Sequence, residues 1–171
     1  MGFESVTKFE NKLANFFGSP FAVAVDCCTH GLELCLRYTK AETFSTPSRT
    51  YLSVPFLAHK LNIEHTWRYV DWKDYYHITN NIIKHLSLGR GGIILTDNRE
   101  ASIQLKKMSY DGRLPNVPWR DQDIDTLGYH YYMTPETAQL GLDKFDLAVQ
   151  TPPRQWSIND WPDLTKMKIF N

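Results

Sequence analysis

The segment FENKLANFFGSPFAVAVDCCTHGLEL, Phe9 to Leu34, changes its hydrophobic periodicity twice and so predicts three elements. The apolar residues that recur at helical spacing around its first part are Val6, Phe9, Leu13 and Phe16. Gly18 then predicts the end of that helix. The short apolar run FAVAV, residues 21–25, predicts a buried strand. The following CTHGLELCLRY predicts a second helix, with Thr29 near its start.

The rest of the chain continues this alternation of strands and helices. Strands are expected in residues 43–48, 63–71 and 91–97, and helices in residues 50–61, 99–110 and 133–145. Thr134 is the expected N-cap of the last helix and Pro135 its first residue. Residues 111–132 are rich in Pro, Gly and Asp and predict a long ordered loop. This order predicts an α/β fold with a largely parallel sheet flanked by helices.

Two parts of the chain are expected to differ in organisation. Residues 1–145 carry the alternating elements, and we expect them to form one domain. Residues 146–171 contain a proline- and tryptophan-rich tail. We expect this tail to pack on the domain or on a partner subunit.

Composition excludes some classes of partner and favours one compartment. Lysine plus arginine and aspartate plus glutamate each number 19 in the 171 residues, so no excess of positive charge points to nucleic acid. The sequence contains no run of 18 apolar residues, so no membrane span is predicted. The first ten residues lack the pattern of a signal peptide. The chain has three cysteines, Cys27, Cys28 and Cys35. Their odd number and close spacing argue against a disulfide framework and favour a reducing, cytoplasmic location. We expect Cys27 and Cys28 to be small buried residues rather than metal ligands, and we expect no metal.

The stretch IIKHLSLGRGGIILTD, residues 82–97, places Lys84 before a glycine-rich turn and an apolar strand. A lysine amine acts as a nucleophile only when it is neutral, which burial or a nearby cation favours. Such a lysine forms Schiff bases with aldehydes such as pyridoxal phosphate. The ordinary alternative is a solvated surface charge. The GRGG turn lacks the GxxxxGK[ST] spacing of a nucleotide-phosphate loop.

Five motifs in one order resemble the DegT/DnrJ/EryC1/StrS family of pyridoxal-phosphate-dependent sugar aminotransferases. The matching stretches are the segment from Phe9 to Leu34, PSRTYLSVP at 47–55, KHLSLGRGG at 84–92, YDGR at 110–113 and GYHYYMTPETAQLGL at 128–142. The resemblance implies an abbreviated fold-type-I (aspartate-aminotransferase-like) large domain with its small domain nearly absent. It also implies a homodimer, and a reaction in which an amino acid donates an amino group to a keto-sugar, such as a nucleotide-sugar.

The same resemblance implies roles for single residues. Lys84 would form the Schiff base and later move the proton at the substrate α-carbon. Thr29 and the backbone N–H groups of Cys28 and His30 would bind the cofactor phosphate at a helix N-terminus. The plain alternative for Thr29 is a helix cap.

Three further residues match family positions. Tyr51 aligns with the aromatic residue that stacks on the pyridine ring, and its alternative is core packing. His130 stands where the family has an asparagine that reaches the phosphate of the neighbouring subunit, or else it is a loop residue with no role. Arg113 would bind a carboxylate or phosphate of the substrate, or form an ordinary ion pair in its loop.

The departures from the family pattern concern the segment before Lys84. The resemblance leads us to expect a D-A-A or D-S-A motif there, whose aspartate pairs with the pyridine nitrogen, and none is present. Roughly two dozen family residues are missing between Ile83 and Lys84. Three explanations stay open: a compact enzyme, a degenerate relative that binds sugars or assembles with partners, or a chain from which a segment is missing.

Overall fold

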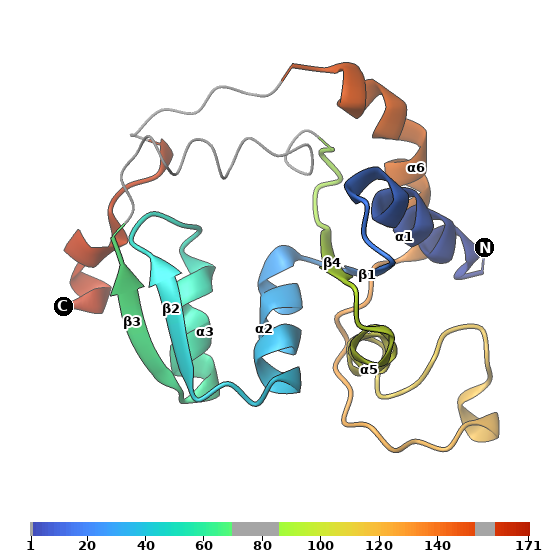
Figure 1. Cartoon of the computed structure of the whole chain (residues 1–171), viewed down its shortest axis with the longest axis horizontal. Coiled ribbons are helices and arrows are strands. Elements are labelled where there is room, and N and C mark those ends of the chain that lie inside the picture. Colours follow the sequence, from blue (N-terminus) through green and yellow to red (C-terminus); the bar gives the residue numbers. More distant parts are fainter. Residues whose placement is uncertain (1, 70–85, 153–159) are drawn as a thin grey trace. The chain divides into compact units, whose positions relative to one another are not determined.

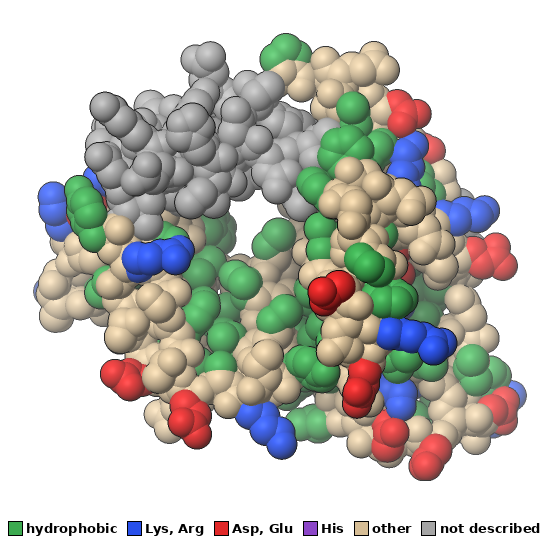
Figure 2. Space-filling model, in the orientation of Figure 1, with side chains coloured by type: hydrophobic (Ala, Val, Ile, Leu, Met, Phe, Trp, Pro, Cys, Tyr) green, Lys and Arg blue, Asp and Glu red, His purple; other side chains and the backbone are tan. Residues whose placement is uncertain are grey.

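The computed structural model describes residues 2–69, 86–152 and 160–171, which fall into two compact units (Figure 1). The first unit comprises Met1–Thr39 and Ser87–Leu147, and the second comprises Lys40–Leu86 and Ala148–Asn171. The domain boundary expected at residue 145 stays a prediction. Figure 2 shows acidic and basic side chains interspersed over the visible face, as a net charge of zero leads one to expect.

The first unit is built on a short antiparallel strand pair. Its elements are α1 (Glu4–Phe17), β1 (Phe21–Val25), α2 (Cys28–Tyr38), β4 (Gly92–Thr96), α5 (Arg99–Ser109), the 3-10 turn η2 (Trp119–Asp121) and most of α6 (Pro135–Gln150). β1 pairs with β4 from Phe21↔Thr96 to Val25↔Gly92. The core between the pair, α2 and α5 contains Val23, Val25, Leu34, Ala101, Leu105 and Met108.

The sequence predicts the end of α1 and the cap of α6, but α6 runs to Gln150, five residues beyond its expected end. α1 ends at Gly18, whose φ of 66° is the left-handed conformation that suits glycine. The N–H of Thr137 donates to Thr134 Oγ1 at 3.3 Å, which confirms the expected cap of α6. The capping residue of α2 is Cys27, however, and not Thr29.

The second unit contains a parallel strand pair. Its elements are β2 (Thr43–Pro47), α3 (Ser53–Leu61), β3 (Glu64–Arg68) and the 3-10 turns η4 (Leu164–Lys166) and η5 (Lys168–Phe170). β2 pairs with β3 from Thr43↔Glu64 to Pro47↔Arg68. The end of the chain packs here, since Leu164 N donates to Ser48 O at 2.8 Å and the Phe170 ring lies 5.1 Å from that of Trp67.

The described strands therefore do not form the largely parallel arrangement expected from the order of elements. One pair is antiparallel and the other parallel, and each belongs to its own unit. Alternating strands and helices indicate an α/β class but do not specify which strand lies beside which. The pairing of β1 with β4 joins segments about seventy residues apart, which no local pattern encodes.

Candidate functional site

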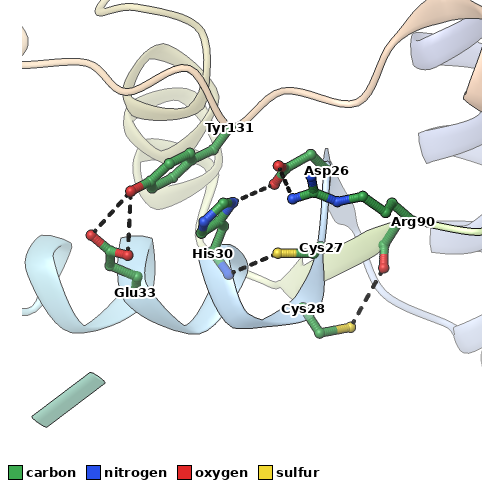
Figure 3. Close-up of polar contacts among 8 residues, drawn as sticks. Asp26, Cys27, Cys28, His30, Glu33, Arg90 and Tyr131 are labelled. Atoms are coloured by element: carbon green, nitrogen blue, oxygen red, sulfur yellow. Dashed lines mark hydrogen bonds and ion pairs between the residues drawn. The ribbon is translucent and has the colours of Figure 1, made fainter. Parts of the chain in front are cut away.

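The site is centred on the turn from β1 into α2. Cys27 has an extended backbone, and its Sγ accepts a hydrogen bond from the N–H of His30 at 3.5 Å (Figure 3). β4 begins directly behind this turn. A Cβ on Gly92 would lie 2.7 Å from both Cys27 C and Cys28 N, so only glycine allows this close approach of the two backbones.

The side chains of His30 and Arg90 contact the carboxylate of Asp26, the residue between β1 and Cys27. One Asp26 oxygen lies 2.7 Å from His30 Nδ1, and the other accepts from Arg90 Nη2 at 2.8 Å. The backbone N–H of Asp26 donates to Tyr131 O at 2.8 Å, which fixes the start of the turn. A hydrogen bond to Cys27 and the charge of Asp26 both raise the pKa of Arg90.

Tyr131 packs on the His30 ring, and the buried carboxylate of Glu33 contacts Tyr131 in turn. Tyr131 stacks on the imidazole with the ring centroids 3.7 Å apart and the planes 8° from parallel. The Tyr131 hydroxyl lies 3.4 Å from both oxygens of Glu33, a residue with no exposed surface (Figure 3). Arg37 Nε and Nη2 donate to the same carboxylate at 3.0 and 2.8 Å. These contacts orient the imidazole on the first turn of α2.

A cavity of about 360 Å³ opens beside Asp26. Its lining residues are Asp26, Arg90, His130, Tyr132, Met133, Thr134 and Thr137. His130 is 73 % exposed, and its Nδ1 lies 3.2 Å from Asp111. The cavity thus combines a guanidinium, an imidazole and three hydroxyl groups, which suits a polar ligand.

The structure brings only some of the predicted site residues together. Cys28, Thr29 and His30 lie on the first turn of α2, and His130 lines the neighbouring cavity. Arg113 lies in the same unit, where its guanidinium is 3.7 Å from Asp111. Tyr51 belongs to the second unit and is 65 % exposed.

Lys84 lies outside the described residues, as does the junction between Ile83 and Lys84.

One expectation about this turn is wrong: Cys27 and Cys28 are not buried, since Cys27 is partly exposed and Cys28 is exposed, with its Sγ 3.8 Å from Gly91 O. The N–H of His30 donates to the sulfur of Cys27 at 3.5 Å, and its expected role in phosphate binding stays a prediction.

The sequence interpretation missed the charge pair of Asp26 and Arg90. These two residues are separated by 64 positions, so no spacing rule connects them. The available signals were weak: an acidic residue at the end of a buried strand, and an arginine between the glycines of the GRGG turn.

One family model matches the first part of the chain. The model of the DegT/DnrJ/EryC1/StrS aminotransferase family matches residues 1–81. A search of curated proteins finds no match.

Solved structures of sugar aminotransferases share the fold. The sugar aminotransferase CalS13 from Micromonospora echinospora matches with a TM-score of 0.69 and 14 % identity, over 85 % of this chain and 61 % of CalS13. The Helicobacter pylori aminotransferase PseC, involved in the biosynthesis of pseudoaminic acid, matches with a TM-score of 0.73 and 11 % identity, over 85 % of this chain and 58 % of PseC. DesI, solved in the presence of its TDP-sugar product, matches with a TM-score of 0.67 and 14 % identity, over 88 % of this chain and 54 % of DesI.

These matches establish the fold and the extent of the likeness. The chain spans about three fifths of the length of CalS13 and PseC. Among the described residues, no helix has the length and apolar character needed to cross a membrane. The resemblance to the DegT/DnrJ/EryC1/StrS aminotransferases, in a shortened fold-type-I form, is thereby confirmed in sequence for residues 1–81 and in fold for most of the chain.

Proposed function

We propose that this protein binds pyridoxal phosphate through Lys84 and transfers an amino group from an amino acid to a keto-sugar. The observation that carries the proposal is the turn between β1 and α2, which lies within residues 1–81 of the family match. The sugar class is supported by the matched proteins described as sugar aminotransferases, and by the TDP-sugar product of DesI.

The first turn of α2 fits a phosphate group. α2 has 11 residues, and its N-terminus presents backbone N–H groups and the positive end of the helix dipole to an anion. We assign phosphate binding to the Thr29 hydroxyl and the N–H of Cys28. The close approach of Gly92 keeps this turn in place, and Arg90 adds a positive charge nearby.

The roles proposed for the remaining residues are those that the resemblance to the family implies. When bound, pyridoxal phosphate supplies an electron sink for charge that develops at the substrate α-carbon. Lys84 would hold the cofactor and move the proton at that carbon. Tyr51 would present a flat ring to the cofactor, His130 would donate to a phosphate of a partner subunit, and Arg113 would bind a substrate carboxylate or phosphate.

Cofactor binding is tested by titrating the full chain with pyridoxal phosphate. We expect a visible absorbance band, and borohydride should fix the reduced cofactor on Lys84, as located by peptide mass spectrometry. Lys84→Ala should lose the band, whereas Lys8→Ala, which removes an exposed lysine of α1, should keep it. Thr29→Ala should weaken the affinity about tenfold through the loss of a charge-assisted hydrogen bond. A full chain that stays colourless at saturating cofactor would refute the assignment.

A second candidate function is binding without catalysis. The observation in its favour is the absence of a D-A-A or D-S-A motif before Lys84, because an aspartate beside the pyridine nitrogen keeps that nitrogen protonated. Incubation of the loaded protein with glutamate and a nucleotide keto-sugar separates the two candidates. Aminated sugar supports the enzyme, whereas a coloured protein without product supports the binding protein.

We also propose a homodimer, because His130 is implied to act across a subunit boundary. Light scattering of the purified protein should give twice the 19.9 kDa mass of the chain. A strictly monomeric protein would remove the proposed role of His130.

A further inference from the structure

Three potential metal ligands converge where β1 meets α2, next to the proposed phosphate site. An oxygen of Asp26, the Sγ of Cys27 and a ring nitrogen of His30 all lie within 4.8 Å of one another. The local geometry explains this grouping. Cys27 is the N-cap of α2 and His30 is its third residue, and side chains at these two positions lie on the same side of the first turn. Figure 3 shows the side chains of all three residues gathered at this turn.

A hydrogen bond and a ring stacking hold the candidate ligands in position. Asp26 is tied to Tyr131 through its backbone, and the His30 ring is stacked on the same tyrosine. Gly92 lies so close to the Cys27 peptide that an added Cβ would lie 2.7 Å from Cys27 C. Supporting contacts of this kind orient metal ligands and raise their affinity.

The chemistry of the ligands favours one class of cation. A thiolate, an imidazole and a carboxylate together suit Zn²⁺, whereas Mg²⁺ and Ca²⁺ prefer oxygen ligands alone. Four-coordinate zinc, with bonds of about 2.0–2.3 Å, requires its ligand atoms to lie roughly 3.3–3.8 Å apart. The present separations, from 2.7 Å between Asp26 and His30 up to at most 4.8 Å, need to change by about 1 Å.

We propose that Asp26, Cys27 and His30 form a binding site for a zinc-class divalent cation, with a fourth position open towards the neighbouring cavity. The cavity of about 360 Å³ is lined by Asp26 and gives water or a ligand access to that position. On binding, Cys27 loses its thiol proton to solvent and no oxidation or reduction occurs.

Arg90 competes with the cation for this site. Its guanidinium contacts Asp26 at 2.8 Å and would repel a metal ion there. The Arg90 side chain is 69 % exposed, so it can leave the carboxylate and be hydrated by water. Removal of this charge should therefore strengthen metal binding, an effect that distinguishes this site from a metal bound elsewhere on the surface.

The test is a titration of the full chain with Co²⁺ in the absence of pyridoxal phosphate. We expect one equivalent to bind with a thiolate-to-cobalt charge-transfer band in the near ultraviolet, and Zn²⁺ to displace it. Cys27→Ser should abolish the band, and His30→Gln should lower the affinity at least about tenfold. Cys28→Ser is the matched control and should keep the band, since Cys28 lies outside the ligand group. Arg90→Gln should raise the affinity several-fold.

Two results would overturn the proposal. One is the absence of a charge-transfer band at saturating Co²⁺ in protein whose circular dichroism shows it to be folded. The other is a band that survives Cys27→Ser but disappears in Cys28→Ser. The titration is repeated with the Lys84→Ala variant, which should still bind Co²⁺ although it no longer forms the cofactor band. The test of metal binding is thus separate from the test of cofactor binding.

Discussion

At the scale of single residues, Gly128 has the least room for an added Cβ among the glycines in the described part of the chain. A Cβ there would lie 1.7 Å from Gly112 N and 2.1 Å from Asp111 C, both backbone atoms that cannot rotate away. We expect Gly128→Ala to lower the free energy of unfolding by about 3 kcal/mol or more, measured by urea denaturation. Gly18→Ala is the control. Gly18 has a φ of 66°, and no atom lies within 4 Å of the added Cβ. Gly18→Ala should therefore lower the free energy of unfolding by only about 1 kcal/mol.

The buried carboxylate of Glu33 gives a second prediction at this scale. Arg37 binds this carboxylate through two hydrogen bonds. Arg37→Met would remove that cation and leave the fully buried charge of Glu33 unpaired with it. We expect a loss of about 3 kcal/mol in unfolding free energy. The double variant Glu33→Leu/Arg37→Met should regain most of it, because no buried charge remains. Equal losses in the single and double variants would show that the loss does not come from the unpaired charge of Glu33.

At the scale of elements, the start of α5 depends on one cap. Asn98 has an extended backbone, and its side chain accepts from Ala101 N at 3.1 Å. We expect Asn98→Ala to cost about 1 kcal/mol, and Asn98→Asp to retain the cap and cost little. Thermal unfolding followed by circular dichroism measures both. If Asn98→Ala unfolds at the same temperature as Asn98→Asp, the cap contributes nothing.

The elements themselves could be predicted well, but their pairing could not. Hydrophobic periodicity and the breaks at Gly18 and Pro135 locate α1, β1 and α6 within a few residues. The antiparallel pairing of β1 with β4 joins strands that are far apart in sequence, and hydrophobic periodicity does not say which distant strands pair. The distant residues of the predicted site, such as His130, came from the family resemblance, and Arg90 was missed because no motif or spacing rule relates it to Asp26.

At the scale of the whole molecule, we expect His65 of the second unit to make the stability of the protein depend on pH. Burial lowers the pKa of His65 below its ordinary value of 6.5, and its Nε2 lies 2.8 Å from Thr46 Oγ1. The unfolded state therefore binds a proton more readily than the folded state. The stability that neutral His65 contributes is fully present above pH 6.5 and is lost as the pH falls from 6.5 through the lowered pKa.

Melting temperatures measured between roughly pH 8 and pH 5 test this prediction. The His65→Gln variant should depend less on pH in the acidic part of that range than the unchanged protein does. His59→Gln removes an exposed histidine of α3 and should leave the dependence unaltered. A pH dependence that is identical in all three proteins would assign the effect to other groups.

The sequence by itself determined the helices and strands, the α/β class and the resemblance to sugar aminotransferases, because periodicity, caps and ordered motifs are local properties of a chain. Only the tertiary structure decided which strands pair, that Arg90 contacts Asp26, and that Tyr131 stacks on His30. The physical reason is distance along the chain. Contacts such as Asp26 to Arg90 and His30 to Tyr131 join residues that no short-range rule relates, and they exist only once β1, β4 and α2 are packed.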